Sequence, residues 1–330
     1  GYVETLEACL SHPHYKAPLK KLQGRGYASG FWFNAGGESS AQVNITEDGN
    51  VVVTTGHPDI GGSRASIANI TAELLGIDIN RVSVLIGDTA SIGFSNLTGG
   101  SRVLFASALV VTESTNQVID ILKDRASKIW NIDKEAIEWE NGEARPAGDN
   151  AGKFKPLSLV ELAEKATPTG GPIGAGHQVN TVGAEGGFAT HICDVEVDIE
   201  LGIARVIRYT AAQDVGKAIH PAYVEGQLQG GVVQGIGWAL NEEYIYNKEG
   251  KLDNPGFLDY RIPVCSDLPM IDTILVEVPN PQHPQGVRGV GEVPIVPPLS
   301  AIANAIYNAI GTRFYSLPMS PPKVLEKISN

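Results

Sequence analysis

Apolar and polar residues alternate along this chain with two different periods, which predict both strands and helices. Residues 41–55 alternate at every second position on either side of Glu47-Asp48-Gly49-Asn50, which predicts a hairpin. From Ser63 to Leu75 the apolar residues recur at helical spacing, and Gly76 follows where a C-terminal cap is expected. Similar patterns predict strands over residues 81–86, 188–200 and 203–214, and helices over 101–127, 157–166, 221–243 and 299–310. Because strands and helices do not alternate regularly, the predicted fold class is α+β, with mixed sheets and packed helices.

The patterned part of the chain divides into two stretches. We expect one subdomain over residues 25–180, which contains an irregular region from residue 128 onward, and a second subdomain over residues 181–330. Residues 1–24 are polar and partly basic, and they have no obvious partner within the chain. We therefore expect them to form an arm that packs on a partner subunit.

Charge and cysteine content exclude several classes of function. Lysine and arginine number 25 and aspartate and glutamate 37, which gives a net charge of −12 and argues against binding to nucleic acid or to an anionic membrane. The cysteines, Cys9, Cys193 and Cys265, show no CxxC spacing, which argues against a disulfide framework or an iron–sulfur site in this chain. No apolar stretch is expected to reach the roughly 20 residues of a membrane span, and no secretory signal is visible. These features predict a cytoplasmic protein.

One carboxylate stands out because of its neighbours. Glu292 follows three glycines and precedes three prolines in the run from Gln285 to Pro298. Glycine lets the backbone pass close to a bulky ligand, and proline stiffens the segment that follows. A carboxylate held in this way is typical of a positioned general base. The alternative is a surface loop rich in glycine and proline with an incidental glutamate.

Two loops lie at predicted helix starts, where unpaired N–H groups favour a phosphate or pyrophosphate. The first loop carries Gly61, Gly62, Ser63 and Ser66, and the second carries Thr98, Gly99, Ser101 and Arg102. The alternative is that serine and glycine serve only as helix caps. The predicted helix over residues 221–243 is rich in glycine, which indicates close approach either of a cofactor or of another helix.

Five segments in this order resemble motifs of the xanthine dehydrogenase and aldehyde oxidase family of molybdenum hydroxylases. They are Asp59–Ser66, Gly87–Thr89 with Thr98–Arg102, Ala189–His191 ahead of Asp194–Asp198, Asp214–Gly216 with Glu225–Gly235, and Gln285–Pro298. The resemblance implies the C-terminal half of a molybdopterin-binding domain. It implies that Glu292 is the catalytic base beside molybdenum, that Gln227 contacts the pterin, and that Thr190 lies near the metal through its backbone.

The chain departs from the family pattern in several places. Gly62 stands where the family often has glutamine, and His191 stands where small apolar residues are common. We interpret His191 as either a substrate-binding residue or a packed histidine, and His283 and Arg288 as further residues that could face substrate. The N-terminal motifs of the molybdenum subunit are missing. This arrangement resembles the split molybdenum subunit of nicotinate dehydrogenase from anaerobic bacteria, and this chain resembles its medium polypeptide.

The resemblance also implies cofactors and partners. Molybdenum is expected on a molybdopterin, in its cytosine dinucleotide form, with oxo and sulfido or selenido ligands and without side-chain ligands. A large molybdopterin subunit, an iron–sulfur subunit with [2Fe-2S] clusters and an FAD subunit are the expected partners, and NADP the final electron acceptor. The small heteroaromatic substrate is expected to be nicotinate, hydroxylated with water to 6-hydroxynicotinate in nicotinate degradation.

Other functions fit parts of the same pattern. The same machinery serves purine, xanthine or aldehyde hydroxylases, and a reductive relative dehydroxylates aromatic thioesters. A subunit that only binds cofactor as a scaffold is a third reading, which the intact Gly-Val-Gly-Glu segment at residues 289–292 disfavours. A nicotinamide-dependent enzyme is disfavoured because no Gly-x-Gly-x-x-Gly motif follows a strand.

Overall fold

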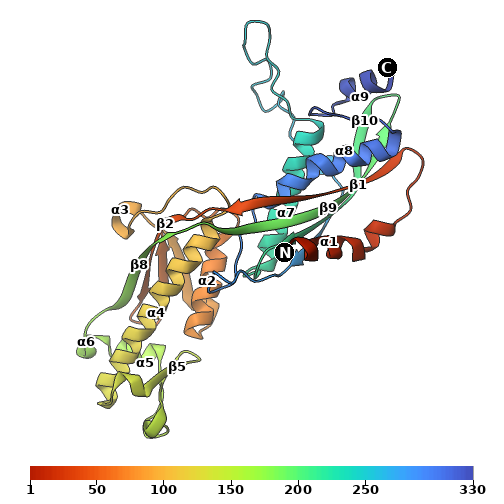
Figure 1. Ribbon diagram of the computed structural model, residues 1–330. Helices are drawn as coiled ribbons and strands as arrows, with labels where there is room; N and C mark the ends of the chain where they lie inside the picture. Colours follow the sequence, from red (N-terminus) through yellow and green to blue (C-terminus); the bar gives the residue numbers. More distant parts are fainter. Residues whose placement is uncertain (330) are drawn as a thin grey trace. The chain divides into compact units, whose positions relative to one another are not determined.

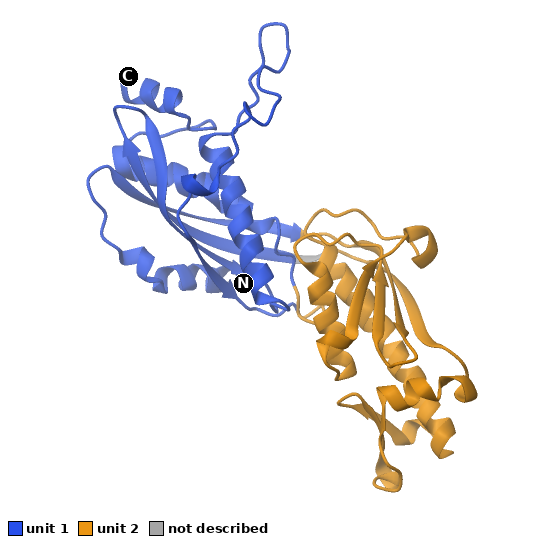
Figure 2. Cartoon of the chain, turned by 180° about the vertical axis from the view of Figure 1, so that it is seen from behind, with its two compact units in different colours: residues 1–33, 185–280, 288–330 blue, residues 34–184, 281–287 orange. Residues whose placement is uncertain are grey.

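The computed structural model describes residues 1–329, which form two compact units. Unit 1 contains residues 1–33, 185–280 and 288–330, and unit 2 contains residues 34–184 and 281–287 (Figure 2). Helices pack against mixed sheets in both units, so the predicted α+β class is confirmed (Figure 1). The units are not the contiguous stretches 25–180 and 181–330, because the first 33 residues complete unit 1 and a short late segment joins unit 2.

Unit 1 is built on a four-stranded sheet in the order β1-β9-β10-β11. β9 and β10 are antiparallel, and β11 runs parallel to β10. The strands are β1 (Gln23–Asn34), β9 (Ala184–Asp198), β10 (Ile203–Asp214) and β11 (Ile271–Val276). The helices are α1 (Tyr2–Ser11), α7 (Pro221–Leu240), α8 (Val296–Ile310) and α9 (Pro321–Ser329), with 3-10 turns η1 (Pro13–Lys16), η5 (Cys265–Asp267) and η6 (Val293–Ile295).

Helices cover both faces of this sheet, because both faces of its inner strands carry apolar side chains. Tyr209 packs in one core cluster with Val232 of α7 and Ile302 of α8. On the other face, Cys9 of α1 packs against the adjoining strands β9 and β10. The expectation that residues 1–24 have no partner within the chain is therefore wrong. Helix α1 buries two positions four residues apart, and so short an apolar stripe is easily missed in a sequence.

Unit 2 contains a four-stranded sheet in the order β4-β3-β2-β8 and a small three-stranded sheet in the order β5-β6-β7. The strands are β2 (Gly37–Ile45), β3 (Val51–Thr55), β4 (Val82–Ile86), β8 (Ile173–Thr181), β5 (Ile137–Glu140), β6 (Glu143–Pro146) and β7 (Leu157–Ser158). The helices are α2 (Ser63–Leu75), α3 (Thr89–Ile92), α4 (Val103–Trp130), α5 (Leu159–Glu164) and α6 (Ala166–Thr169), with 3-10 turns η2 (Ile79–Arg81), η3 (Lys134–Ala136) and η4 (Gly148–Asn150).

The core of unit 2 lies between its large sheet and helices α2 and α4. Val43 and Val53 of the sheet pack in one cluster with Ile67 of α2 and Val118 of α4. The predicted hairpin β2–β3 and helix α2 are confirmed. The helix expected over residues 157–166 is instead a short strand followed by α5, and Ser158 caps α5 through a capping box with Glu161.

One stretch of the described residues, Val293–Ile310, has the length and apolar composition of a membrane-spanning helix. The sequence pattern did not predict such a stretch. It comprises η6 and α8, and 44% of it is buried inside the chain. Ala301, Ile302 and Ile306 lie in the core of unit 1 against the sheet. The segment is apolar because it is a core helix of this unit.

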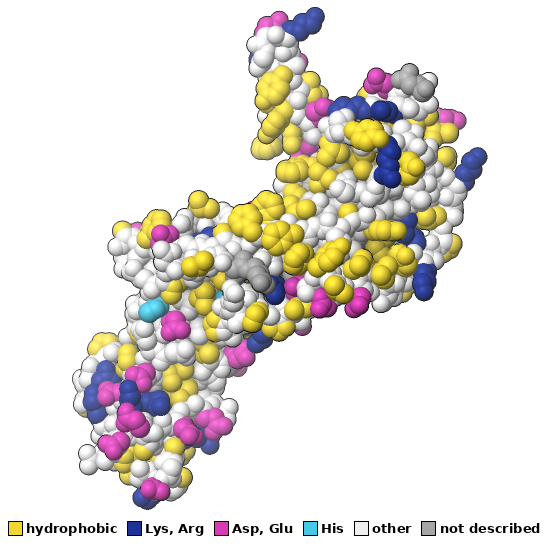
Figure 3. Space-filling view, viewed as in Figure 1, with side chains coloured by type: hydrophobic (Ala, Val, Ile, Leu, Met, Phe, Trp, Pro, Cys, Tyr) yellow, Lys and Arg dark blue, Asp and Glu magenta, His cyan; other side chains and the backbone are white. Residues whose placement is uncertain are grey.

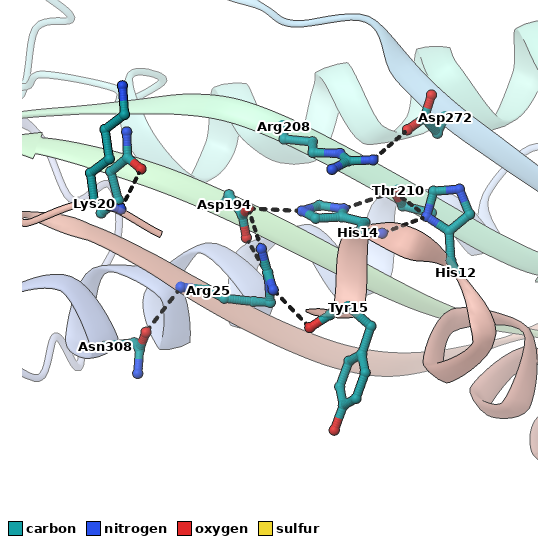
Figure 4. Close-up of polar contacts among 11 residues, drawn as sticks. His12, His14, Tyr15, Lys20, Arg25, Asp194, Arg208, Thr210, Asp272 and Asn308 are labelled. Atoms are coloured by element: carbon teal, nitrogen blue, oxygen red, sulfur yellow. Dashed lines mark hydrogen bonds and ion pairs between the residues drawn. The ribbon is translucent and has the colours of Figure 1, made fainter. Parts of the chain in front are cut away.

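A buried ionic cluster fastens the N-terminal segment to the sheet (Figure 4). Nε and Nη2 of Arg25 each donate to one carboxylate oxygen of Asp194 at 2.7 Å, and Nε2 of His14 lies 3.1 Å from the same carboxylate. Nδ1 of His14 lies 2.8 Å from the hydroxyl of Thr210 on β10. Burial raises the pKa of Asp194, but the contacts with His14 and Arg25 outweigh it and hold that pKa below its ordinary value.

We predict that Asp194→Asn lowers the free energy of unfolding by about 3–5 kcal/mol at pH 7, because it leaves the largely enclosed Arg25 without its counter-charge. The folded-state pKa of Asp194 is lowered, so its contribution is complete above the unfolded-state value of about 3.9 and disappears as the pH falls through the folded-state value. Urea unfolding from pH 7 down to pH 3 measures this. Asp124→Asn, which removes an exposed pair with Lys128, is the control and is expected to cost less than about 1 kcal/mol. Equal losses for the two variants would contradict a buried clamp.

Candidate functional site

Glu292 lies at the start of the turn η6, in a segment that packs tightly on helix α7. Its side chain is half-buried, and Val293 and Pro294 after it are buried. A Cβ on Gly231 of α7 would overlap the ring of Pro294, and a Cβ on Gly235 would lie 2.6 Å from Cβ of Pro298. The helix can approach the proline segment only because glycine stands at these positions. Glu292 is therefore held by rigid backbone, as a positioned base requires.

The segment before Glu292 is fixed by buried polar contacts. Nε of Arg288 lies 3.1 Å from Oδ2 of Asp214 and donates to the carbonyl of Val278. Nη1 of Arg288 donates to the carbonyl of Gly186. Arg288 is buried among these groups, so the structure assigns it to anchoring the loop and does not support the predicted substrate contact. Its neighbours in sequence gave no indication of this, because its partners come from β9, β10 and the segment after β11.

Gln213 is a residue of this region that the sequence patterns did not single out. It is fully buried in β10, and its Nε2 donates to the carbonyl of Val290 at 3.0 Å, two residues before Glu292. The sequence could have indicated Gln213, because it directly precedes the Asp214-Val215-Gly216 motif.

The first half of α7 offers an open face. Nothing lies within 4 Å of a Cβ placed on Gly226 or on Gly230, which are exposed. Gln227, the predicted pterin contact, is half-buried beside them. The glycines of this helix therefore divide into two sets. Gly231 and Gly235 pack on the proline segment, as the packing alternative predicted, whereas Gly226 and Gly230 leave room for a ligand.

Thr190 and His191 lie on β9 and face opposite sides of the sheet. The hydroxyl of Thr190 lies 3.1 Å from that of Thr5 on α1 and 2.9 Å from that of Ser29 on β1. His191 is fully buried, its Nδ1 lies 3.0 Å from the Tyr209 hydroxyl, and burial lowers the pKa of His191 to about 3. A neutral, enclosed imidazole fits a packed histidine better than a substrate-binding one.

The first loop of unit 2 has the backbone form expected of a close ligand approach. Gly61 and Gly62 both have positive φ, at 72° and 77°, and Gly62 is the N-cap of α2 without a side-chain capping bond. Ser63 and Ser66 are buried, and the hydroxyl of Ser63 donates to the carbonyl of Pro58. The carboxylate of Asp59 accepts from the backbone N–H of Arg64, so the chain already uses one donor of this helix start.

The second loop is held by Arg102, which is 2% exposed. Its guanidinium donates to the carbonyls of Gly36, Glu38, Asn96 and Leu97 and to the hydroxyl of Ser39. A guanidinium has five N–H donors, so Arg102 has little left for a phosphate. These bonds give Arg102 a role in shaping the loop, and its contact with cofactor stays a prediction. Thr98 is exposed, Gly99 is half-buried, and Ser101 has a φ of 52° just before α4.

His57 was not predicted, yet it lies in the same network at the base of the first loop. Its Nε2 is 2.8 Å from the hydroxyl of Ser39, which also accepts from Arg102. Burial and then the charge of Arg102 lower the pKa of His57 to about 4, so its ring is neutral at pH 7. The sequence could have indicated His57 by its position, two residues after the end of β3 and just before the first loop.

His283 is packed within unit 2. Its Nε2 lies 3.0 Å from the carbonyl of Phe105, and its Nδ1 accepts from the N–H of Gln285. Burial lowers the pKa of His283, while the bond to Phe105 opposes this. Both ring nitrogens of His283 thus have partners within the chain. Neither is free for the predicted contact with substrate.

The residues of unit 1 fit a bulky organic cofactor. The open glycine face of α7 leaves space where side chains would otherwise stand, and Gln227 borders that face. Among the described residues, no group of three or more His, Cys, Asp or Glu could hold a metal ion.

A family model described as the molybdopterin cofactor-binding domain matches residues 13–269. The chain belongs to this family, which confirms the resemblance to the molybdopterin domain of xanthine dehydrogenase and aldehyde oxidase type molybdenum hydroxylases.

Two curated relatives and one solved structure illustrate the range of the family. The xanthine dehydrogenase molybdenum-binding subunit of Escherichia coli O157:H7 is 29% identical over 91% of this chain and 41% of its own length. The nicotine 6-hydroxylase large subunit of Paenarthrobacter nicotinovorans is 29% identical over 87% of this chain and 36% of its own length. The crystal structure of quinoline 2-oxidoreductase from Pseudomonas putida 86 superposes with a TM-score of 0.85 at 25% identity, over 99% of this chain and 43% of that chain. The chain spans about two fifths of the length of these proteins.

The two sets of glycines on α7 are expected to respond oppositely to alanine. Gly230→Ala should stabilise the chain by about 0.5–1 kcal/mol, because alanine is the better helix former and meets open space. Gly231→Ala should destabilise it by about 1–3 kcal/mol, because the new methyl overlaps Pro294. Urea unfolding of the two variants measures both. Stabilisation by Gly231→Ala would contradict the packing of Glu292 described above.

Arg102→Gln is expected to lower the stability of the cofactor-free chain by about 3 kcal/mol or more, because several buried carbonyls lose their donor. Arg64→Gln, which alters an exposed arginine beside the first loop, is the control and is expected to change stability by less than about 0.5 kcal/mol. Thermal and urea unfolding measure both variants. If Arg102→Gln is as stable as the wild type, the loop does not need Arg102, and its N–H donors are available for a phosphate.

Proposed function

We propose that this chain is the medium molybdopterin-binding subunit of a multi-subunit cytoplasmic hydroxylase that converts nicotinate and water to 6-hydroxynicotinate. The observation that carries the proposal is the position of Glu292. Its backbone is clamped between the loop anchored by Arg288 and the prolines that pack on α7, and the same helix offers an open glycine face. A carboxylate on rigid backbone next to space for a large cofactor suits a base in a cofactor-dependent reaction.

Each group of the chain has a separate task in this proposal. Glu292 accepts a proton at a carboxylate oxygen when the substrate ring is hydroxylated. In unit 1, Gln227 and the exposed glycines of α7 hold the pterin. In unit 2, the two loops at helix starts offer backbone N–H groups that suit a phosphate. When bound, the molybdenum cofactor supplies oxygen transfer and takes up two electrons. In the proposed complex those electrons leave through [2Fe-2S] clusters and FAD on partner subunits to NADP.

The relatives support an N-heteroaromatic substrate. One is named a nicotine 6-hydroxylase and another a quinoline 2-oxidoreductase, and both names specify a ring that contains nitrogen. The proposed large molybdopterin subunit accounts for the part of these proteins that the chain does not span. The cytosine dinucleotide form of the cofactor and a selenido ligand on molybdenum belong to the same proposal.

A purine or xanthine hydroxylase is the second candidate, because the E. coli xanthine dehydrogenase subunit matches at the same identity as the nicotine enzyme. A substrate panel with a dye acceptor separates the two. Turnover of nicotinate above xanthine and benzaldehyde supports the first proposal, and preference for xanthine overturns it.

Glu292→Gln is expected to lower kcat of the native complex by about 10²–10⁴-fold, because glutamine keeps the shape of the side chain but cannot accept the proton. Molybdenum content per complex should stay unchanged. Glu138→Gln, at an exposed position on β5, is the control and should keep full activity. Metal analysis and turnover with a dye acceptor measure both properties. An active Glu292→Gln complex with normal metal content would exclude Glu292 as the base.

A further inference from the structure

One edge of the sheet in unit 1 is paired along only part of its length. β10 pairs with β9 from Ile203 to Gln213, but β11 pairs with its other side only from Tyr209 onward. Within the described part of the chain, residues 203–208 have no strand beside them on that second side. A free strand edge presents backbone N–H and C=O groups that can pair with another strand.

A cavity of about 1200 Å³ lies along this edge. Its lining includes residues 203–207 of β10 on one side and most of the segment 257–269 on the other. Residues from the end of α7 complete it, and none of the predicted site residues lines it. Space for an additional strand therefore exists directly beside the unpaired part of β10.

The segment that forms the far side of the cavity is strongly apolar and exposed. Phe257 is fully exposed, Leu258 is 91% exposed, and Ile262 and Val264 are more than half exposed. Figure 3 shows hydrophobic side chains gathered on the loop that projects from this unit. Side chains of this kind gain about 1.5–3 kcal/mol each when they are buried, so the surface favours a covering partner.

We propose that residues 203–208 of β10 accept an extended segment of the large molybdopterin subunit as a fifth strand, covered by the segment 257–269. This inference rests on the proposed function, because it names the surface by which the proposed partner is bound. The partner strand would pair through its backbone with β10 and place apolar side chains against Phe257, Leu258 and Ile262.

The charge of the edge argues against a second copy of this chain in the same place. Arg205 lies on the unpaired edge, and Arg261 lines the cavity opposite it, with Asp267 as the acidic residue of that lining. Two such edges in antiparallel contact would bring the arginines of both copies together. A strand with acidic residues between its apolar ones matches the surface better. The relatives also carry more than half of their length outside the region that this chain matches.

Site-specific photocrosslinking in the native complex tests the partner. A benzoylphenylalanine at position 257 is expected to crosslink to the large molybdopterin subunit, and mass spectrometry identifies the crosslinked segment. The same probe at Tyr315, which is 89% exposed and lies outside the cavity lining, is the control and should not reach that segment. A crosslink to a second copy, to an unrelated protein or to nothing would overturn the proposal.

Binding strength and amide exchange supply a second test. The double variant Phe257→Asp with Leu258→Asp is expected to bind the large subunit about tenfold or more weakly, whereas Tyr315→Asp should not change binding. In the wild-type complex, those amides of residues 203–208 that point away from β9 should become protected from exchange. A complex that contains molybdenum and turns over substrate without this protection would disprove the strand pairing and leave the proposed function intact. A chain that forms no complex and holds no molybdenum would defeat both.

Discussion

The contact between α7 and the proline segment is the constraint on which the candidate site depends. A helix can approach backbone this closely only where its residues lack a Cβ, and Gly231 and Gly235 provide that at successive turns. The prolines supply the matching surface and cannot relax by bending. Glu292 begins the turn that carries the first of these prolines, so packing fixes the direction of its backbone.

The buried arginines Arg102 and Arg288 donate hydrogen bonds to backbone carbonyl groups of this chain. Arg102 holds the second loop through carbonyl groups, and Arg288 pairs with Asp214 beneath the loop that leads to Glu292. His283 and His191 are enclosed as neutral rings. An anionic cofactor would therefore meet backbone N–H groups of the loops more than charged side chains of this chain. Neutralisation of its charge by this chain would fall to the helix starts.

The sequence predicted the fold where apolar periodicity is long, and failed where pairing partners are distant. Helix α2, the hairpin β2–β3 and the long pair β9–β10 follow from local pattern, and the α+β class follows from them. Helix α1 was missed because two buried positions make too short a stripe. Strand β8 was missed because its alternation is interrupted by glycines, and its place is set by pairing with β2, more than a hundred residues earlier.

The candidate site was predictable to a different degree for each residue type. Glu292 and the glycine-rich helix could be found because glycine and proline impose geometry on their neighbours. The roles of Arg102, Arg288 and His283 could not, since each depends on carbonyl groups that the fold brings from other elements. A motif shows that an arginine is present, but only the surrounding backbone decides whether its donors remain free.

The path of the chain through the two units determines the order in which they can fold during synthesis. Unit 2 draws nearly all its residues from one continuous stretch, 34–184, whereas unit 1 needs residues from the first 33, from the middle and from the last 43. A ribosome releases the N-terminal strand β1 long before α8, the helix that covers it, has been translated. Unit 2 can thus fold during synthesis, while the unit that carries Glu292 must wait, with β1 uncovered, until α8 has been translated.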